Sequence, residues 1–106
     1  MKLVEQRCLP MEGHHAMTPY EIGQYLGMVS GWAAVDGAIE KTYEFANYHE
    51  TIAFVNALAW IANREDHHPD LAVSYSRCAV RFNTHSVGGL SINDFICAAK
   101  LDALIT

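Results

Sequence analysis

The sequence predicts an α+β domain in two layers. An N-terminal helix precedes the order β-β-α-β-β-α, and a four-stranded antiparallel sheet carries its helices on one face. Three observations predict this class: a helix start at Thr18-Pro19, a hairpin turn at Asp36-Gly37, and a long apolar helical stripe after Asn47. Hairpins pair their strands antiparallel, so the helices must cover one face of the sheet. The other face and the edges are left open, which favours self-association.

Length and composition exclude several classes of protein. The 106 residues suit one domain, and 51% hydrophobic with 18% charged residues describes an ordinary globular chain. The net charge is −5, and there is no Lys/Arg run to bind a nucleic-acid backbone. Three cysteines without a CxxC motif indicate reduced thiols and a cytoplasmic protein. Neither a signal peptide nor a membrane span is indicated.

Residues 1–17 have no hydrophobic periodicity, although they contain Cys8, Pro10 and the doublet His14-His15. We expect a mobile or loosely packed N-terminal segment here, and a single domain over residues 18–106. A metal site at the doublet would need further ligands, so a solvated tail is the favoured interpretation.

The first half of the domain has clear start and turn signals. Thr18 can cap a helix that has Pro19 in its first turn and Glu21 completing a capping box, and Ser30-Gly31 ends this helix. A short strand over 32–35 meets the Asp36-Gly37 turn, and the return strand runs to about residue 45 with one apolar and one polar face.

The second half of the domain begins with a helix, and two strands and a further helix follow it in the order β-β-α. Asn47 caps the longest helix, which extends to about Arg64. Two strands of alternating apolar and polar residues follow over 71–75 and 78–82. Tyr75 lies on the same face of its strand as the apolar residues, which favours a position in the core. Ser91 opens the last helix, with Asp94 at the third helical position, where helix capping could be its whole role.

A cluster of titratable side chains follows the longest helix, in the stretch Glu65-Asp66-His67-His68-Pro69. A third histidine, His85, follows the last strand. Histidine titrates near neutral pH, so one ring can act as base while another acts as acid on a small polar substrate. The alternative is that His67 and His68 only end a helix that Pro69 stops. We expect no metal, because no HxxxH, HxH or CxxC spacing is present.

The spacing of these residues resembles the signature of the pterin-4a-carbinolamine dehydratases. It comprises His67-His68-Pro69, Tyr75, His85 and Asp94, and the similarity extends through Gly31-Trp32, Phe45 and Gly89-Leu90-Ser91, over about residues 18–104. The resemblance implies dehydration of 4a-hydroxytetrahydrobiopterin to quinonoid dihydropterin. This reaction recycles tetrahydrobiopterin for an aromatic amino acid hydroxylase, and needs neither metal nor bound cofactor.

The resemblance also implies roles for individual residues. His67 and His85 would be base and acid, His68 would hold the pterin, and hydrogen bonds would come from Asp66 and Thr84. Asp94, counted with the substrate-binding residues, would position a histidine or the helix start. The resemblance also implies a homodimer or homotetramer. We include Trp32 and Asn63 among the substrate-binding residues, although a tryptophan more often belongs to a core or interface.

Asn63 stands where relatives usually have a charged residue, so we expect turnover to be affected more than substrate binding. Some relatives are also dimerisation cofactors of a homeodomain transcription factor. The alternative function is therefore a non-enzymatic interaction module with weak or no dehydratase activity.

Overall fold

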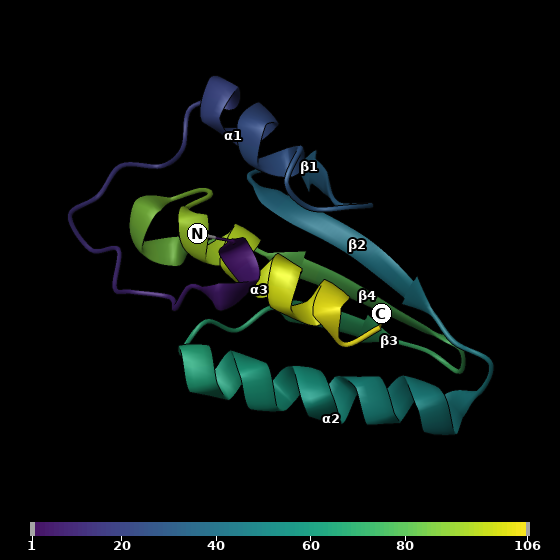
Figure 1. The fold of residues 1–106 in the computed structure, drawn as a ribbon. Coiled ribbons are helices and arrows are strands. Elements are labelled where there is room, and N and C mark those ends of the chain that lie inside the picture. Colours follow the sequence, from purple (N-terminus) through teal and green to yellow (C-terminus); the bar gives the residue numbers. More distant parts are fainter. Residues whose placement is uncertain (1, 106) are drawn as a thin grey trace.

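The computed structural model describes residues 2–105 as an α+β fold, as the sequence predicts. Figure 1 shows the arrangement of its elements. The helices are α1 (Pro19–Leu26), α2 (Tyr48–Glu65) and α3 (Ile92–Ala103), and short 3₁₀ turns lie at Leu3–Glu5 and His85–Val87. The strands are β1 (Ala33–Val35), β2 (Ala38–Glu44), β3 (Asp70–Val73) and β4 (Arg77–Phe82).

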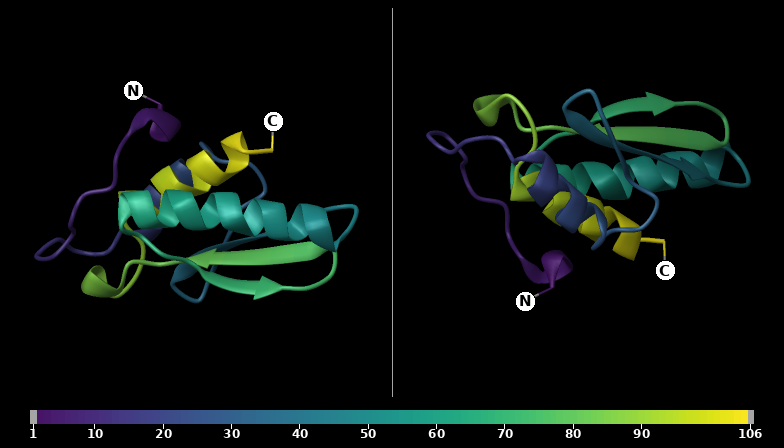
Figure 2. Two further views of the ribbon diagram at one scale, coloured as in Figure 1. Left: turned by 90° about the horizontal axis from the view of Figure 1, so that it is seen from below. Right: turned by 90° about the horizontal axis from the view of Figure 1, so that it is seen from above.

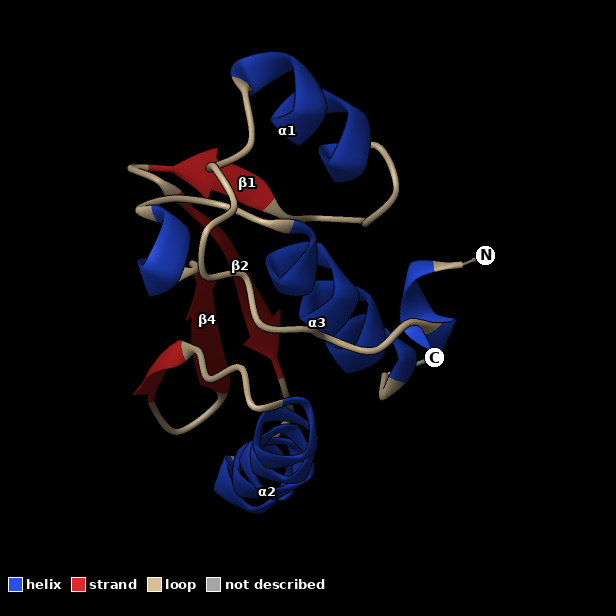
Figure 3. Cartoon of the chain, turned by 90° about the vertical axis from the view of Figure 1, so that its left-hand side faces the viewer, coloured by secondary structure: helices blue, strands red, loops and turns tan. Residues whose placement is uncertain are grey.

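The four strands form one antiparallel sheet in the order β1-β2-β4-β3. All three helices lie on one side of it, with α3 between α1 and α2 (Figures 2 and 3). Asp36 and Gly37 join β1 to β2 with φ angles of 48° and 79°, as the predicted turn requires. The two-layer arrangement and the hairpin are therefore confirmed.

The core lies between the sheet and α2 and α3. Alternate side chains of β2 and β4 are buried there, as predicted, together with rings and aliphatic groups of the two helices: Ile39, Tyr43, Cys78, Val80, Phe82, Phe54, Leu58, Phe95, Ile96 and Leu101. In β3 the predicted alternation is wrong, because all four residues of this outermost strand are exposed. Tyr75 is likewise 65% exposed and stacks on Tyr48 at the surface instead of entering the core.

Tertiary contacts hold part of the segment 2–17, although Leu3 is its only buried residue. Leu3 is buried against the core, and Lys100 of α3 donates a hydrogen bond to the Val4 carbonyl at 2.8 Å. Asn93 of α3 binds both backbone groups of Leu9, at 3.2 Å and 2.7 Å. These are tertiary contacts to side chains far along the sequence, so the missing local periodicity did not reveal them.

Candidate active site

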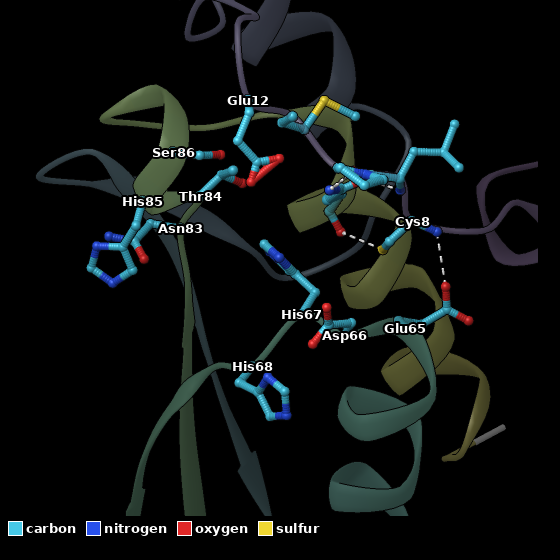
Figure 4. Close-up of a pocket in the computed structure, with 14 residues that line it drawn as sticks. Cys8, Glu12, Glu65, Asp66, His67, His68, Asn83, Thr84, His85 and Ser86 are labelled. Atoms are coloured by element: carbon cyan, nitrogen blue, oxygen red, sulfur yellow. Dashed lines mark hydrogen bonds between the residues drawn. The ribbon is translucent and has the colours of Figure 1, made fainter.

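A cavity of about 410 Å³ opens where α2 and β4 end and the N-terminal segment crosses between them (Figure 4). Its size lies in the range of small-molecule sites. Five of the eight predicted site residues line it, from two stretches of the chain: Asp66, His67, His68, Thr84 and His85. The structure therefore brings the predicted histidines to one cavity.

The end of α2 directs His67 toward the sheet. Asp66 adopts the left-handed conformation, with φ 52° and ψ 43°, and the His67 N–H donates to the Ala62 carbonyl at 3.1 Å. This Schellman-type ending closes the helix and reverses the chain. His67 consequently returns toward β4, where its ring stacks on Phe82 with centroids 5.8 Å apart and planes 9° from parallel.

His67 forms a short hydrogen bond with Asp94, with 2.6 Å between Nε2 and Oδ1. The carboxylate can only accept when ionised, so Nε2 carries the proton in this pair. Nδ1 has no hydrogen-bond partner among residues 2–105 and is not fully buried. In the neutral ring Nδ1 therefore bears the lone pair that can accept a proton.

Asp94 is fully buried and satisfied by hydrogen bonds. Its Oδ2 accepts from the Thr84 hydroxyl at 2.8 Å and from the Ser91 N–H at 2.9 Å. Since the Thr84 proton goes to Asp94, the Ser91 hydroxyl donates to Thr84 Oγ1 over their 2.8 Å contact. Asp94 thus completes the predicted capping box of α3 and also holds the His67 ring.

The other two histidines line the cavity from exposed positions. His68 follows His67 in the loop before β3, and His85 opens the 3₁₀ turn that follows β4. In Figure 4 the His67 ring points toward Thr84, and the rings of His68 and His85 lie farther out on two sides of it. Histidines thus flank His67 where a ligand can enter.

Trp32 and Asn63 do not line this cavity, so the structure does not bring them together with the histidines. Trp32 is only 7% exposed and packs on Phe82, while its indole N–H donates to Asp102 at 3.1 Å. Asn63 is exposed on α2, and its carbonyl accepts the N–H of Asp66. One is therefore a core residue, and the other belongs to the helix end.

Sequence reasoning missed a wall of the cavity formed by residues 8–12, which we call the N-terminal wall. Its Glu12 side chain lines the cavity (Figure 4), and it has no ion-pair or hydrogen-bond partner in the described chain. Asn83, Ser86 and Asn93 also line the cavity. The only local signal was a charged residue in a Pro- and Gly-containing loop, which does not identify a site.

Glu65 anchors the N-terminal wall. Its side chain is 2% exposed, and Oε2 lies 3.0 Å from Arg7 Nε while Oε1 accepts the Cys8 N–H at 2.8 Å. Burial acts to raise the pKa of Glu65, but the hydrogen bonds from Cys8 and Arg7 and the charge of Lys100 outweigh it. The pKa of Glu65 is thus lowered from its ordinary value of 4.5.

We expect Glu65→Gln to be most destabilising at neutral pH and progressively less so under acid. The lowered pKa means that ionised Glu65 contributes stability above its unfolded-state value, and that this contribution is lost as the pH falls below about 4.5. Urea denaturation of both proteins between neutral and acid pH measures the difference. Glu44→Gln is the matched control, because that carboxylate is 72% exposed and forms a surface ion pair with Arg77. A pH-independent difference would contradict the prediction.

No group of three or more metal-ligating side chains lies together within residues 2–105. In the same part of the chain, no helix is both long and apolar enough to cross a bilayer.

Comparison with known proteins assigns the chain to a family. The family model for pterin 4 alpha carbinolamine dehydratase matches residues 15–104. A candidate pterin-4-alpha-carbinolamine dehydratase of Chromobacterium violaceum is 55% identical over 104 residues, covering 98% of this chain and 96% of the relative. Another from Bdellovibrio bacteriovorus is 53% identical, covering 97% and 88%.

Solved structures resemble the fold. A protein described as a transcriptional coactivator/pterin dehydratase from Brucella melitensis superposes with a TM-score of 0.83 at 30% identity, covering 87% of this chain and all of that one. A pterin dehydratase-like RuBisCO assembly factor of the alpha-carboxysome has a TM-score of 0.58 at 23% identity, covering 69% and 84%, and shows a shared fold alone. The protein described here is a member of the pterin-4-alpha-carbinolamine dehydratase family.

Proposed function

We propose that this protein dehydrates 4a-hydroxytetrahydropterins, such as 4a-hydroxytetrahydrobiopterin, to quinonoid dihydropterins by histidine acid/base catalysis. Family membership supports the reaction class. The observation that carries the proposal is the His67–Asp94 pair, in which a buried carboxylate holds a histidine whose second nitrogen is free at a small-molecule cavity. A base held in one tautomer is what abstraction of a single proton requires.

The reaction needs one proton removed and one delivered. His67 Nδ1 takes the N5 proton of the pterin, the N5 electron pair forms the N5=C4a bond, and the C4a–O bond breaks. His85 gives a proton to the departing hydroxyl, which leaves as water. Asp94 stabilises the imidazolium that forms at His67. His68 and Asp66 hold the pterin, and the scheme uses no metal or further cofactor.

Glu12 supplies a contact for the pyrimidine end of the substrate. A pterin presents its N3–H and 2-amino group side by side, and one carboxylate accepts both hydrogens. Glu65 also lines the cavity but is already bonded to Arg7 and Cys8. The unpaired Glu12 is therefore the acceptor that we assign to this edge.

Replacement of Glu12 by glutamine is expected to raise KM by about 10-fold, the equivalent of one charge-assisted hydrogen bond, with kcat within about 3-fold of wild type. The glutamine amide has the shape of the carboxylate, but its N–H₂ group faces one of the two pterin donors and cannot accept a hydrogen bond from it. Steady-state kinetics over a range of pterin concentrations separate the two constants. Glu5→Gln, which changes an exposed carboxylate outside the cavity, serves as control. A fall in kcat at unchanged KM would reject this role.

The deciding experiment follows the decay of 4a-hydroxytetrahydropterin, which also dehydrates without a catalyst. Purified protein should accelerate the loss of its ultraviolet absorbance in proportion to protein concentration. Heat-denatured protein provides the background rate. Native protein that leaves the decay unchanged would eliminate the proposed activity.

An interaction role is the second candidate, and exposed aromatic side chains favour it. Trp60 and Tyr48 of α2 are 63% and 53% exposed, and Tyr75 near the outermost strand is 65% exposed. We propose that such exposed rings support a homodimer or homotetramer, and light scattering coupled to gel filtration measures its mass. A module that acts only by binding would assemble normally and show no dehydratase activity. Cytoplasmic pterin recycling for an aromatic amino acid hydroxylase is the setting we propose for the enzyme.

A further inference from the structure

Two of the three cysteines are in contact across the fold. Cys8 Sγ and Cys97 Sγ lie 3.6 Å apart although 89 positions separate them in the sequence. Cys97 is fully buried in α3, whereas Cys8 is partly exposed and lines the cavity. The third cysteine, Cys78, is buried in β4 and has no sulfur contact among residues 2–105.

The contact is held from both sides by backbone hydrogen bonds. Glu65 fixes the Cys8 N–H at 2.8 Å, and Asn93, one turn before Cys97 on α3, holds Leu9 through both backbone groups. Cys8 Sγ also lies 3.6 Å from the Asn93 carbonyl. The two sulfurs therefore meet because the N-terminal wall is bound to α3, and a disulfide requires them to close from 3.6 Å to about 2.05 Å.

We propose that Cys8 and Cys97 form an oxidation site, at which a hydroperoxide entering the cavity converts the two thiols into a disulfide that ties the N-terminal wall to α3. The proposal concerns the thiols alone and does not depend on the dehydratase activity. In a reducing compartment the pair rests as thiols and responds when peroxide rises.

The chemistry proceeds in two balanced steps. Cys8 sulfur attacks the terminal oxygen of the hydroperoxide, the S–O bond forms as the O–O bond breaks, and the alkoxide or hydroxide leaves with the thiol proton. Cys97 sulfur then attacks the Cys8 sulfenic sulfur, so that the S–S bond forms, the S–O bond breaks, and hydroxide leaves with the Cys97 proton as water. The two sulfurs together lose two electrons to the peroxide.

The surroundings assign the order of the two cysteines. A hydrogen bond with Cys8 and burial raise the pKa of the Cys97 thiol, so Cys97 stays protonated. Only Cys8 borders the cavity through which an oxidant arrives. Cys8 is thus the residue that is oxidised first, and Cys97 is the resolving thiol, with its proton beside the leaving hydroxyl.

The test is peroxide titration of the reduced, folded protein, followed by intact mass measurement and non-reducing peptide mapping. We expect the mass of two hydrogens to be lost, a peptide pair joined through Cys8 and Cys97, and full reversal by dithiothreitol. Closing so long a loop should raise Tm by roughly 20 °C. Cys78→Ser is the matched control and should oxidise like wild type.

The single variants test the order of events. Cys97→Ser should stop at a Cys8 sulfenic acid that dimedone traps, and Cys8→Ser should show neither adduct nor disulfide. The wild-type and Cys78→Ser data decide the matter if a variant fails to fold. An unchanged mass in folded wild type, a link through Cys78, or a disulfide between two molecules would overturn the proposal. Dehydratase activity plays no part in this readout, so its absence would leave the result unaffected.

Discussion

His67→Gln is expected to lower kcat by about 10²–10⁴-fold, the range for loss of a positioned proton-transfer group, while KM changes little. Glutamine can still donate an N–H to Asp94 and fill the space beside Phe82, so the fold should be retained. It has no basic nitrogen that can stand in for Nδ1. We therefore expect the fall in kcat to reflect lost proton transfer, and not altered packing or pterin binding.

Stopped-flow measurement of 4a-hydroxytetrahydropterin decay gives both constants. His49→Gln is the control, because this exposed histidine lies near the start of α2, away from the cavity. Added imidazole should restore part of the rate of a His67→Gly variant, since the small base can occupy the vacated space. A His67→Gln enzyme with near wild-type kcat would show that another group removes the proton.

The parts of the fold that were predictable from the sequence depend on local signals. The capping box at Thr18 and Glu21, the Asn47 cap and the Asp36-Gly37 turn each act within a few residues, and the structure contains all three. Their energetics are decided by neighbouring backbone groups, so a short stretch of sequence is enough to predict them.

Contacts between distant segments were not predictable from the sequence. Trp32 has an aromatic ring and one N–H, which would serve a ligand as well as a core, and its contacts with Phe82 and Asp102 appear only in the folded chain. The alternation of Leu71 and Val73 is typical of a half-buried strand, but β3 lies at the sheet edge, outside the buried core cluster. The position of a strand in the sheet depends on the whole fold, and the alternation of apolar and polar residues within the strand does not predict it.

The candidate site shows the same division. Its histidines were predictable as a cluster of titratable groups, and the structure brings His67, His68 and His85 to one cavity. The hydrogen bond between His67 and Asp94 joins residues 27 positions apart. Spacing alone does not predict this bond, because the helix-capping pattern already gives Asp94 a sufficient role. The N-terminal wall had no such signal, because Glu65 and Asn93, which anchor it, lie far along the chain.

Asp94→Asn is expected to reduce kcat by about 10²–10⁴-fold, by analogy with the loss of about 10⁴-fold when the orienting aspartate of a Ser-His-Asp triad becomes asparagine. The Asp94 carboxylate accepts from three donors: His67, Thr84 and the Ser91 N–H. An amide has one oxygen. If that oxygen faces Thr84 and Ser91, the amide N–H₂ faces His67 Nε2, which must then become the acceptor. The ring proton moves to Nδ1, and the atom facing the cavity can no longer take a proton.

The helix cap should suffer as well, so stability must be separated from catalysis. Ser91→Ala removes the other half of the capping box at a cost of about 1 kcal/mol, yet leaves the His67–Asp94 bond in place. Urea denaturation and kcat measured on both variants distinguish the two roles. Asp94→Asn should lose far more activity than Ser91→Ala, and nitrogen NMR of its His67 ring should show the exchanged tautomer. Equal losses of activity in the two variants would mean that Asp94 only begins the helix, and His67 would then need another group to hold its proton on Nε2.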